Sequence, residues 1–358
     1  MAKQRKHQSR LQQLLHSKNL KIDLCKELGL NIKKDNTYII PIFIPHRGCK
    51  NECVFCNQRK ISGETRDVTE DDVRCEIEKY LEMYKDNTRK KQIAFFGGSF
   101  TGLDIEDQIK FLNVANEYIE KGLVENIRIS TRPDYITELI LKILKQKNVK
   151  IIELGVQSMD DEVLLAAKRG HTAANVVKAS NLIKKYGFVL GHQVMVGLPK
   201  STLEKEIYTM ERCIELKPEI VRIYPVYVLK ESKLWEMYEE KEYIPLELED
   251  AVKRASEMYT LCVKNNIKVI RIGLQTTEEI NSKNIEIVGP VCDNYKERVL
   301  SHISYINVKE KLDKIKSKKD INLIVNSKEV NYVVGNNKSN LNKYNSEYSG
   351  KVEIKVKE

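Results

Sequence analysis

Apolar residues recur along the chain in two alternating spacings. Short runs rich in β-branched and aromatic residues predict strands, and longer stretches with apolar residues every three or four positions predict helices. The helical spacing is seen, for example, at Ile136, Leu139, Ile140, Ile143 and Leu144. The predicted strands are 39–44, 92–96, 126–130, 150–155, 189–196 and 219–224, and the predicted helices between them are 69–84, 104–121, 134–145, 172–186 and 201–216.

Six strand–helix units in a row predict parallel strands joined by right-handed crossovers. A complete eight-unit barrel needs about 250 residues, whereas these units end near residue 224. The expected fold class is therefore α/β, a partial (β/α)6 TIM-like barrel followed by a small C-terminal α+β extension.

The pattern changes after Pro225, where helices at 232–238 and 246–265 and a strand at 268–273 predict a cap that continues the sheet. Beyond it we expect a helix at 294–301 and three short strands, at 321–325, 330–334 and 352–356. Three regions follow: a basic helical N-terminal arm (1–38), a core with its cap (39–275) and a small C-terminal α+β extension (276–358).

Composition limits the class of protein. Hydrophobic residues make up 41% of the 358 residues, which suffices for a core, and the net charge is +10. No apolar run approaches the roughly 20 residues of a membrane span, and no apolar signal segment follows Met1, so we expect a cytoplasmic protein. Basic residues gather at 3–21 and 309–319, where they can bind nucleic acid phosphates or form solvated helix faces.

Cys49, Cys53 and Cys56 form a C-x3-C-x2-C triplet directly after the first core strand. Thiolates on a short loop suit an iron–sulfur cluster or zinc. Three ligands would leave one iron of a [4Fe-4S] cluster open to a small molecule, which favours catalysis. The alternative is a zinc site whose fourth ligand is His46 or the more distant Cys75.

Polar or glycine-rich motifs follow the later strands, at the end where βα folds place their ligands. Gly97, Gly98 and Ser99 form a turn in which the missing Cβ atoms let the backbone approach a ligand. The other candidate ligand-binding residues at strand ends are Arg132 in Thr-Arg-Pro-Asp-Tyr, Gln157 and Ser158 in Gly-Val-Gln-Ser, Arg169 in Arg-Gly-His-Thr, and Met195 before Gly-Leu-Pro.

The cysteine triplet, with Phe55 before its third member, resembles the cluster loop of the radical S-adenosylmethionine superfamily. That resemblance implies a [4Fe-4S] cluster on Cys49, Cys53 and Cys56 whose open iron binds S-adenosylmethionine, the source of a 5′-deoxyadenosyl radical. It implies cofactor contacts by Phe55, Gly97, Gly98, Ser99, Arg132, Gln157, Ser158, Arg169 and Met195. Because the cofactor supplies the reactivity, no residue is assigned a catalytic role.

The motifs in their order are most similar to the radical module of the Elongator catalytic subunit family, and Arg222-Ile223-Tyr224-Pro225 matches a further motif of that family. The chain departs from the family in its short Cys49–Cys53 spacing and in Ser130, where the family commonly has glutamate. About 80 residues follow Gly273, too few for the family's acetyltransferase domain, so we expect that domain to be absent.

The substrate implied by this resemblance is RNA, in particular tRNA, with an external one-electron donor such as flavodoxin or ferredoxin. The Gly-Val-Gln-Ser and Arg-Gly-His motifs also resemble oxygen-independent coproporphyrinogen oxidases, so a small-molecule radical enzyme is the alternative. A remote, non-enzymatic alternative is a zinc-clamped RNA-binding module.

Overall fold

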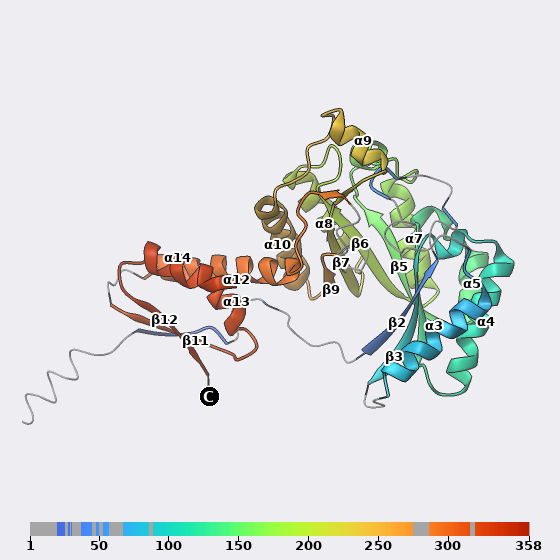
Figure 1. The fold of residues 1–358 in the computed structure, drawn as a ribbon, viewed down its shortest axis with the longest axis horizontal. Helices are drawn as coiled ribbons and strands as arrows, with labels where there is room; N and C mark the ends of the chain where they lie inside the picture. Colours follow the sequence, from blue (N-terminus) through green and yellow to red (C-terminus); the bar gives the residue numbers. More distant parts are fainter. Residues whose placement is uncertain are drawn as a thin grey trace, which may run out of the picture. The chain divides into compact units, whose positions relative to one another are not determined.

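The computed structural model describes residues 20–25, 28, 30, 37–44, 48–49, 53–56, 67–85, 89–274, 286–315 and 319–357. The chain divides into two compact units, one of residues 33–295 and one of residues 1–32 with 296–358. Figure 1 shows the elements of both units. The domain boundaries expected from the sequence stay a prediction, and residues 1–19 of the expected N-terminal arm lie outside the described residues.

Seven parallel strands form the sheet of the larger unit, and they follow one another in chain order. Together they curl into a half-barrel, which confirms the expected fold class (Figure 1). All six predicted core strands are present, and the strand assigned to the cap is the seventh. The strands are β2 (Thr37–Ile44), β3 (Lys90–Gly97), β4 (Asn126–Thr131), β5 (Val149–Gln157), β6 (Val189–Val196), β7 (Ile220–Pro225) and β9 (Lys268–Ile272).

Helices connect these strands and cover one face of the sheet (Figure 1). Four begin at a threonine whose hydroxyl accepts a hydrogen bond from the backbone N–H three residues on, which satisfies an otherwise unpaired donor: Thr69, Thr137, Thr172 and Thr202. The helices are α3 (Glu70–Met83), α4 (Ile105–Glu120), α5 (Glu138–Gln146), α6 (Asp161–Ala166), α7 (Ala173–Lys185), α8 (Leu203–Glu215) and α10 (Leu248–Lys264).

Two expected helix starts are wrong. The helix expected to begin at Asp134 begins at Glu138, capped by Thr137, because Pro133 to Tyr135 form a separate 3-10 turn, η2. The helix expected to begin at Ser201 begins at Leu203, with Thr202 as its cap. The Ser201 hydroxyl donates instead to Glu206, at 2.7 Å.

The two faces of the sheet differ in chemistry. Toward the helices, strand residues are apolar and fully buried, among them Ile93, Ile127 and Ile152. His192 lies on this side too, since its Nε2 contacts the Ser180 hydroxyl of α7 at 2.9 Å. The residues that alternate with these along each strand therefore point to the opposite, concave face of the sheet.

A short antiparallel pair, β8 (Val228–Leu229) and β10 (Ile287–Val288), and the helix α9 (Lys233–Glu239) complete the larger unit. Their apolar side chains pack with Val54 and Phe55 of the cysteine loop. The backbone joins them as well, because the Leu234 N–H donates to the Val54 carbonyl at 2.7 Å. This cap therefore holds the cysteine loop.

The smaller unit contains a parallel sheet in the order β1 (Leu20–Asp23), β11 (Ile321–Val325), β12 (Val352–Val356). Residues 330–334, expected as a strand, form helix α13 (Val330–Val334). Parallel neighbours such as β11 and β12 need a crossover connection, and α13 with α14 (Ser339–Glu347) provides it. The unit also contains α12 (Tyr295–Asp313) and η3 (Asn336–Lys338).

Throughout the described ranges, we find no helix with the length and apolarity needed to cross a membrane.

Candidate functional site

The cysteine loop lies against the turn after β3. A Cβ atom built on Gly48 would lie 2.1 Å from the carbonyl oxygen of Ser99, and one on Gly102 would lie 2.0 Å from the carbonyl oxygen of Gly48. Real side chains do not tolerate such distances, so both positions require glycine. The Cys49 thiol donates to the Ser99 hydroxyl at 3.5 Å. The first cysteine and the glycine turn are thus brought together, as expected.

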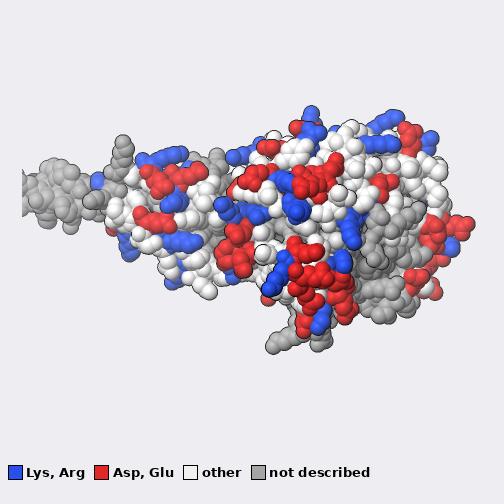
Figure 2. All heavy atoms as spheres, turned by 90° about the horizontal axis from the view of Figure 1, so that it is seen from above, with Lys and Arg blue, Asp and Glu red and all other residues white. Residues whose placement is uncertain are grey.

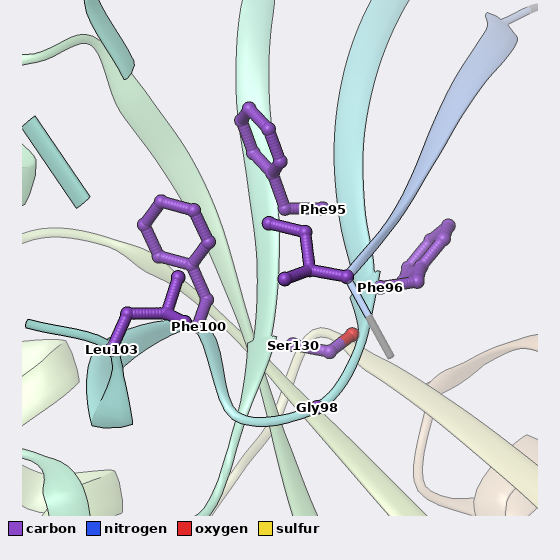
Figure 3. Close-up of a pocket in the computed structure, with 7 residues that line it drawn as sticks. Phe95, Phe96, Gly98, Phe100, Leu103 and Ser130 are labelled. Carbon is purple, nitrogen blue, oxygen red and sulfur yellow. The ribbon is translucent and has the colours of Figure 1, made fainter. Parts of the chain in front are cut away.

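The glycine turn is tied in turn to the end of β2. The Gly98 N–H donates to the Ile44 carbonyl at 2.8 Å. Gly97 has a φ of +103°, and a Cβ there would lie 2.8 Å from the Ile44 oxygen. Beside the turn is a small, mainly apolar pocket (Figure 3), lined by Ile44, Phe95, Phe96, Gly98, Phe100, Leu103 and Ser130.

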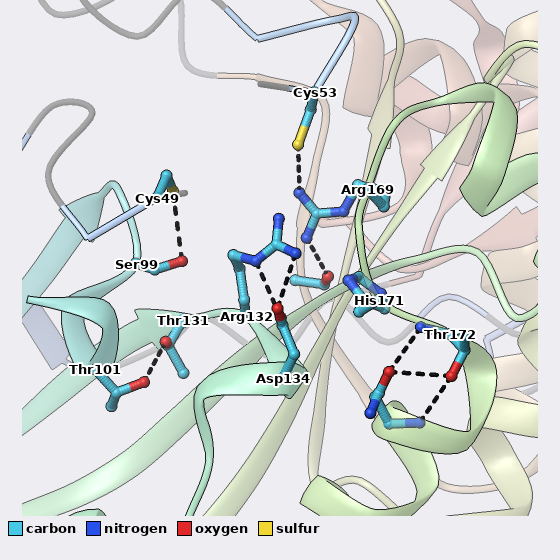
Figure 4. A network of polar contacts seen from close by, with 12 residues as sticks. Cys49, Cys53, Ser99, Thr101, Thr131, Arg132, Asp134, Arg169, His171 and Thr172 are labelled. Carbon is cyan, nitrogen blue, oxygen red and sulfur yellow. Dashed lines mark hydrogen bonds and ion pairs between the residues drawn. The ribbon is translucent and has the colours of Figure 1, made fainter. Parts of the chain in front are cut away.

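Arg169 contacts the second cysteine. Its Nη1 donates to the Cys53 sulfur at 3.0 Å and its Nη2 donates to the Gly155 carbonyl at 2.7 Å (Figure 4). The side chain is buried, at 6% exposure, so the contact is not a surface ion pair. Arg169 therefore places a buried positive charge beside a sulfur that could ligate a metal.

Arg132 lies beside Arg169 (Figure 4) and is 3% exposed. Its Nε and Nη2 both donate to Asp134, each at 3.0 Å. Burial works to lower the pKa of Arg132, but the Asp134 hydrogen bonds and charge, with the nearby Cys53, outweigh it and the pKa is raised. Its buried Nη1 has no hydrogen-bond partner among the described residues. One donor beside the cysteines is therefore left for a ligand.

His171 stands next to both arginines (Figure 4) and is almost fully buried. Its Nε2 contacts the Val156 carbonyl at 3.2 Å. Burial, and then the charges of Arg169 and Arg132, lower the pKa of His171 to about 3. The imidazole is therefore neutral at physiological pH, and it adds no third positive charge.

Gln157 and Ser158 point in different directions. Gln157 has a φ of +66° and accepts a 3.4 Å hydrogen bond from Gln193 on β6. A Cβ on Gly155 would lie 3.0 Å from its Nε2 and 3.2 Å from the Arg169 Nη2, so both side chains lie over this glycine. The Ser158 hydroxyl instead contacts Thr209 of α8, at 3.2 Å. Its assignment as a cofactor contact stays a prediction.

Phe55 and Met195 belong to one apolar cluster, which also contains Val54 and Tyr224. The third cysteine, Cys56, adjoins this cluster, and its N–H donates to the Cys53 carbonyl at 3.0 Å. Two residues expected at the cofactor are thus placed together from separate segments of the chain.

The three thiols themselves are not gathered. Over the described stretches, no three His, Cys, Asp or Glu side chains stand close enough together to hold a metal ion. The ligand roles of Cys49, Cys53 and Cys56 therefore stay a prediction. Of the alternative zinc ligands, His46 lies outside the described residues, and Cys75 is exposed on α3.

Sequence reasoning missed Glu206 on α8, which fixes the loop after β6. Its Oε1 accepts hydrogen bonds from the Gly197 N–H and the Ser201 hydroxyl, both at 2.7 Å. Arg254 donates to the same oxygen at 3.3 Å. Burial outweighs these partners and raises the pKa of Glu206. The helical pattern placed Glu206 without marking it, whereas Gly48 could have been noticed because it directly precedes Cys49.

A parallel half-barrel with a three-cysteine loop, a glycine turn and buried arginines at the carboxyl ends of its strands defines a class of cluster-dependent enzymes. The model described as Radical SAM superfamily matches residues 43–213, and the model described as Radical_SAM C-terminal domain matches residues 218–304. The chain belongs to the radical S-adenosylmethionine superfamily, and it is an enzyme of that class.

Its relatives include Elongator-like proteins. The chain is 32% identical over 257 residues to a tRNA uridine(34) acetyltransferase of Methanocaldococcus jannaschii, covering 63% of this chain and 48% of that protein. It is 30% identical over 241 residues to an uncharacterized protein of the same organism, covering 63% of this chain and 72% of that protein. The chain thus spans about half the length of the curated acetyltransferase it matches.

Among solved structures, the chain resembles the Elp3 protein of Methanocaldococcus infernus. The TM-score is 0.58 at 23% sequence identity, and the match covers 77% of this chain and 63% of that one. At this identity the likeness shows the fold, which agrees with the half-barrel described above.

The site fits the cofactors that the superfamily implies. Three cysteines offer soft ligands for a [4Fe-4S] cluster. Gly48 and Gly102 let the backbone of the cysteine loop and of the turn after β3 approach each other closely. The unpartnered Arg132 Nη1 offers a buried cationic donor that suits a carboxylate such as that of S-adenosylmethionine.

Proposed function

We propose that this chain is a radical S-adenosylmethionine enzyme that modifies RNA, with tRNA as the substrate. The observation that carries the proposal is the three-cysteine loop with two buried arginines at Cys53, in a chain 32% identical to a tRNA uridine(34) acetyltransferase. An external one-electron donor, such as flavodoxin or ferredoxin, would supply the electron.

When bound, the [4Fe-4S] cluster and S-adenosylmethionine supply a 5′-deoxyadenosyl radical that abstracts hydrogen from the substrate. Cys49, Cys53 and Cys56 would hold the cluster. Arg132 would donate to the carboxylate of S-adenosylmethionine, and the backbone at Gly97 and Gly98 would meet its amino group. Phe55 and Met195, in one buried cluster, keep water away from that side.

The charged surface bears on RNA binding. Lysines and arginines are interspersed with acidic residues on the face shown in Figure 2. In the basic stretch at 309–319, Lys309 pairs with Glu347 at 2.5 Å, so part of the positive charge of the stretch is neutralised. Lys316 and Lys318 of the same stretch lie outside the described residues. Contacts to RNA phosphates would therefore need lysines elsewhere as well, such as those of the N-terminal arm.

The test begins with anaerobically reconstituted protein, dithionite as electron donor and unmodified tRNA transcripts. We expect 5′-deoxyadenosine to form faster with tRNA present, and mass spectrometry to find one changed nucleoside in the RNA. In RNA from a deletion strain, the same nucleoside should be missing its modification. Formation of 5′-deoxyadenosine that RNA leaves unchanged, together with normal nucleosides in the deletion strain, would overturn the RNA proposal in favour of a small-molecule substrate.

A further inference from the structure

A group of charged side chains lies on the concave face of the sheet, below the cysteine loop. Strand register sets Glu153 of β5 beside Ser130 of β4, and Arg222 of β7 beside Arg271 of β9. Neighbours in register project from the same face of a parallel sheet. These residues occupy strand positions opposite in parity to His192, which faces the helices, so they line the concave side.

Glu153 binds two of the arginines on this face. The Arg128 Nε lies 3.3 Å from its Oε1, and the Arg222 Nη2 donates to the same oxygen at 3.1 Å. Arg222 also donates to the Tyr224 hydroxyl at 2.9 Å, and its guanidinium stands 4.9 Å from the centre of the Phe96 ring. The single carboxylate is therefore shared, and Arg222 is held in a fixed place.

Arg271 is the third guanidinium and has a weaker set of contacts. Its Nε donates to the Gly273 carbonyl at 3.3 Å, and no ion pair with an acidic side chain is found for it within the described ranges. Burial lowers the pKa of Arg271, Tyr224 opposes this by raising it, and the charge of Arg222 lowers it further, so the pKa is lowered overall. The geometry and the direction of this shift agree with a cation that has no acidic partner among the described residues.

Arg128 and Arg222 both contact the Glu153 carboxylate, and Arg271 stands beside Arg222 with no acidic partner within the described ranges. A partly buried cation is unfavourable without an anion nearby. We propose that Arg271, beside the fixed Arg222, binds a phosphate group of the substrate on the concave face of the barrel. A guanidinium fork matches the oxygens of a phosphate, with two parallel hydrogen bonds.

This inference rests on the proposed function in taking the phosphate to belong to a nucleotide of RNA. Arg222 lies three positions before Pro225, the last residue of β7, which is about 10 Å along a strand. A nucleotide held there by its phosphate would extend its sugar and base toward the strand ends, where the cysteine loop lies. Arg271 would then be a positioning residue that selects substrates carrying a phosphate.

Calorimetric titration of the full-length, reconstituted protein tests the proposal without turnover. Uridine 5′-monophosphate should bind at least ten times more tightly than uridine, which lacks the phosphate. Arg271→Gln should remove this difference, and Arg271→Lys should restore only part of it, since an ammonium keeps the charge but lacks the fork. Arg212→Gln, which removes an exposed arginine of α8, should bind both ligands like the wild type.

A second experiment distinguishes whether the site binds the phosphate of a free nucleotide or that of an RNA chain. With an anticodon stem-loop RNA, Arg271→Gln should lower the steepness of the log–log salt dependence of binding by about one, whereas Arg212→Gln should not. Iron content and thermal melting check that each variant is folded. Equal binding of uridine and its monophosphate, or no effect of Arg271→Gln in either experiment, refutes the phosphate site. The RNA proposal itself fails only on the turnover and nucleoside assays.

Discussion

Two buried arginines decide the chemistry around Cys53. Arg169 reaches its sulfur and Arg132 adds a second cation, while His171 between them stays neutral because burial and both arginines lower its pKa to about 3. The result is a site with positive charge next to thiols, which suits a cluster that carries negative charge and a cofactor that carries a carboxylate.

Arg132→Gln tests the role of the unpartnered donor. It removes both Asp134 contacts and the charge, and a charged hydrogen bond contributes about 1.5–3 kcal/mol, so affinity for S-adenosylmethionine should fall by about tenfold or more. Anaerobic equilibrium dialysis of reconstituted protein measures this. Arg212→Gln is the matched control on the surface. Unchanged affinity at normal iron content would show that Arg132 only holds Asp134.

His192 makes stability depend on pH. Burial lowers its pKa to about 3, so the unfolded chain takes up a proton as pH falls through about 6.5 while the folded chain does not. The contribution of His192 to the free energy of unfolding is therefore fully present above about pH 6.5 and decreases below it, by about 2 kcal/mol at pH 5. Urea unfolding at pH 7.5 and 5 measures the loss, and His192→Gln should lose less. An equal loss in the variant would assign the pH dependence to other groups.

At the scale of elements, the site depends on how closely the cysteine loop meets the turn after β3. The contact is between backbone atoms at Gly48, Ser99 and Gly102, so it cannot give way by moving a side chain. The Leu234 N–H holds the other end of the loop through the Val54 carbonyl. Fixing a ligand loop at both ends limits how far its backbone can move during cluster assembly.

Gly48→Ala should therefore prevent cluster assembly. The new Cβ would collide with the Ser99 carbonyl, at 2.1 Å, in addition to the strain of a φ of +76°. Gly122→Ala is a matched control, since its φ is +69° but nothing lies within 4 Å of the new Cβ. Iron and labile sulfide should fall at least severalfold in Gly48→Ala and stay normal in Gly122→Ala. Normal iron in both would mean that the loop can move away from the turn.

At the scale of the molecule, the N-terminal segment takes part in the smaller unit. β1 pairs with β11, so the strand at Leu20–Asp23 belongs to a sheet built from both ends of the chain. The basic residues before it, within 1–19, lie outside the described residues. Their role in RNA binding can be tested without disturbing β1.

Deletion of residues 1–19 should weaken tRNA binding and reduce the steepness of its log–log salt dependence. The five lysines and arginines of this segment, if all contact phosphates, would contribute about −3.5 to −4.5 to the slope. Filter binding of tRNA at salt concentrations between about 50 and 200 mM compares the slopes of the full-length and truncated proteins. Cluster content should not change. The same salt dependence for both proteins would remove the arm from the RNA interface, whereas lower thermal stability with unchanged binding would mean that the arm only packs.

By itself the sequence determined the order of strands and helices, because alternation of apolar runs is local, and it determined the family, because motifs such as Cys49 to Cys56 are contiguous. It failed where a long-range constraint decided the outcome. Residues 330–334 carry a strand-like pattern, but the parallel pairing of β11 with β12 requires a crossover there.

Only the tertiary structure decided which side chains meet. Singly, Arg132 and Arg169 could be read as surface residues. Both are buried, and Arg169 contacts Cys53 with Arg132 beside it, because strands far apart in the chain end at the same edge. The charge on the concave face has the same origin, since Glu153, Arg222 and Arg271 are neighbours only through strand register. Local patterns set the elements, and pairing between distant strands set the chemistry of the site.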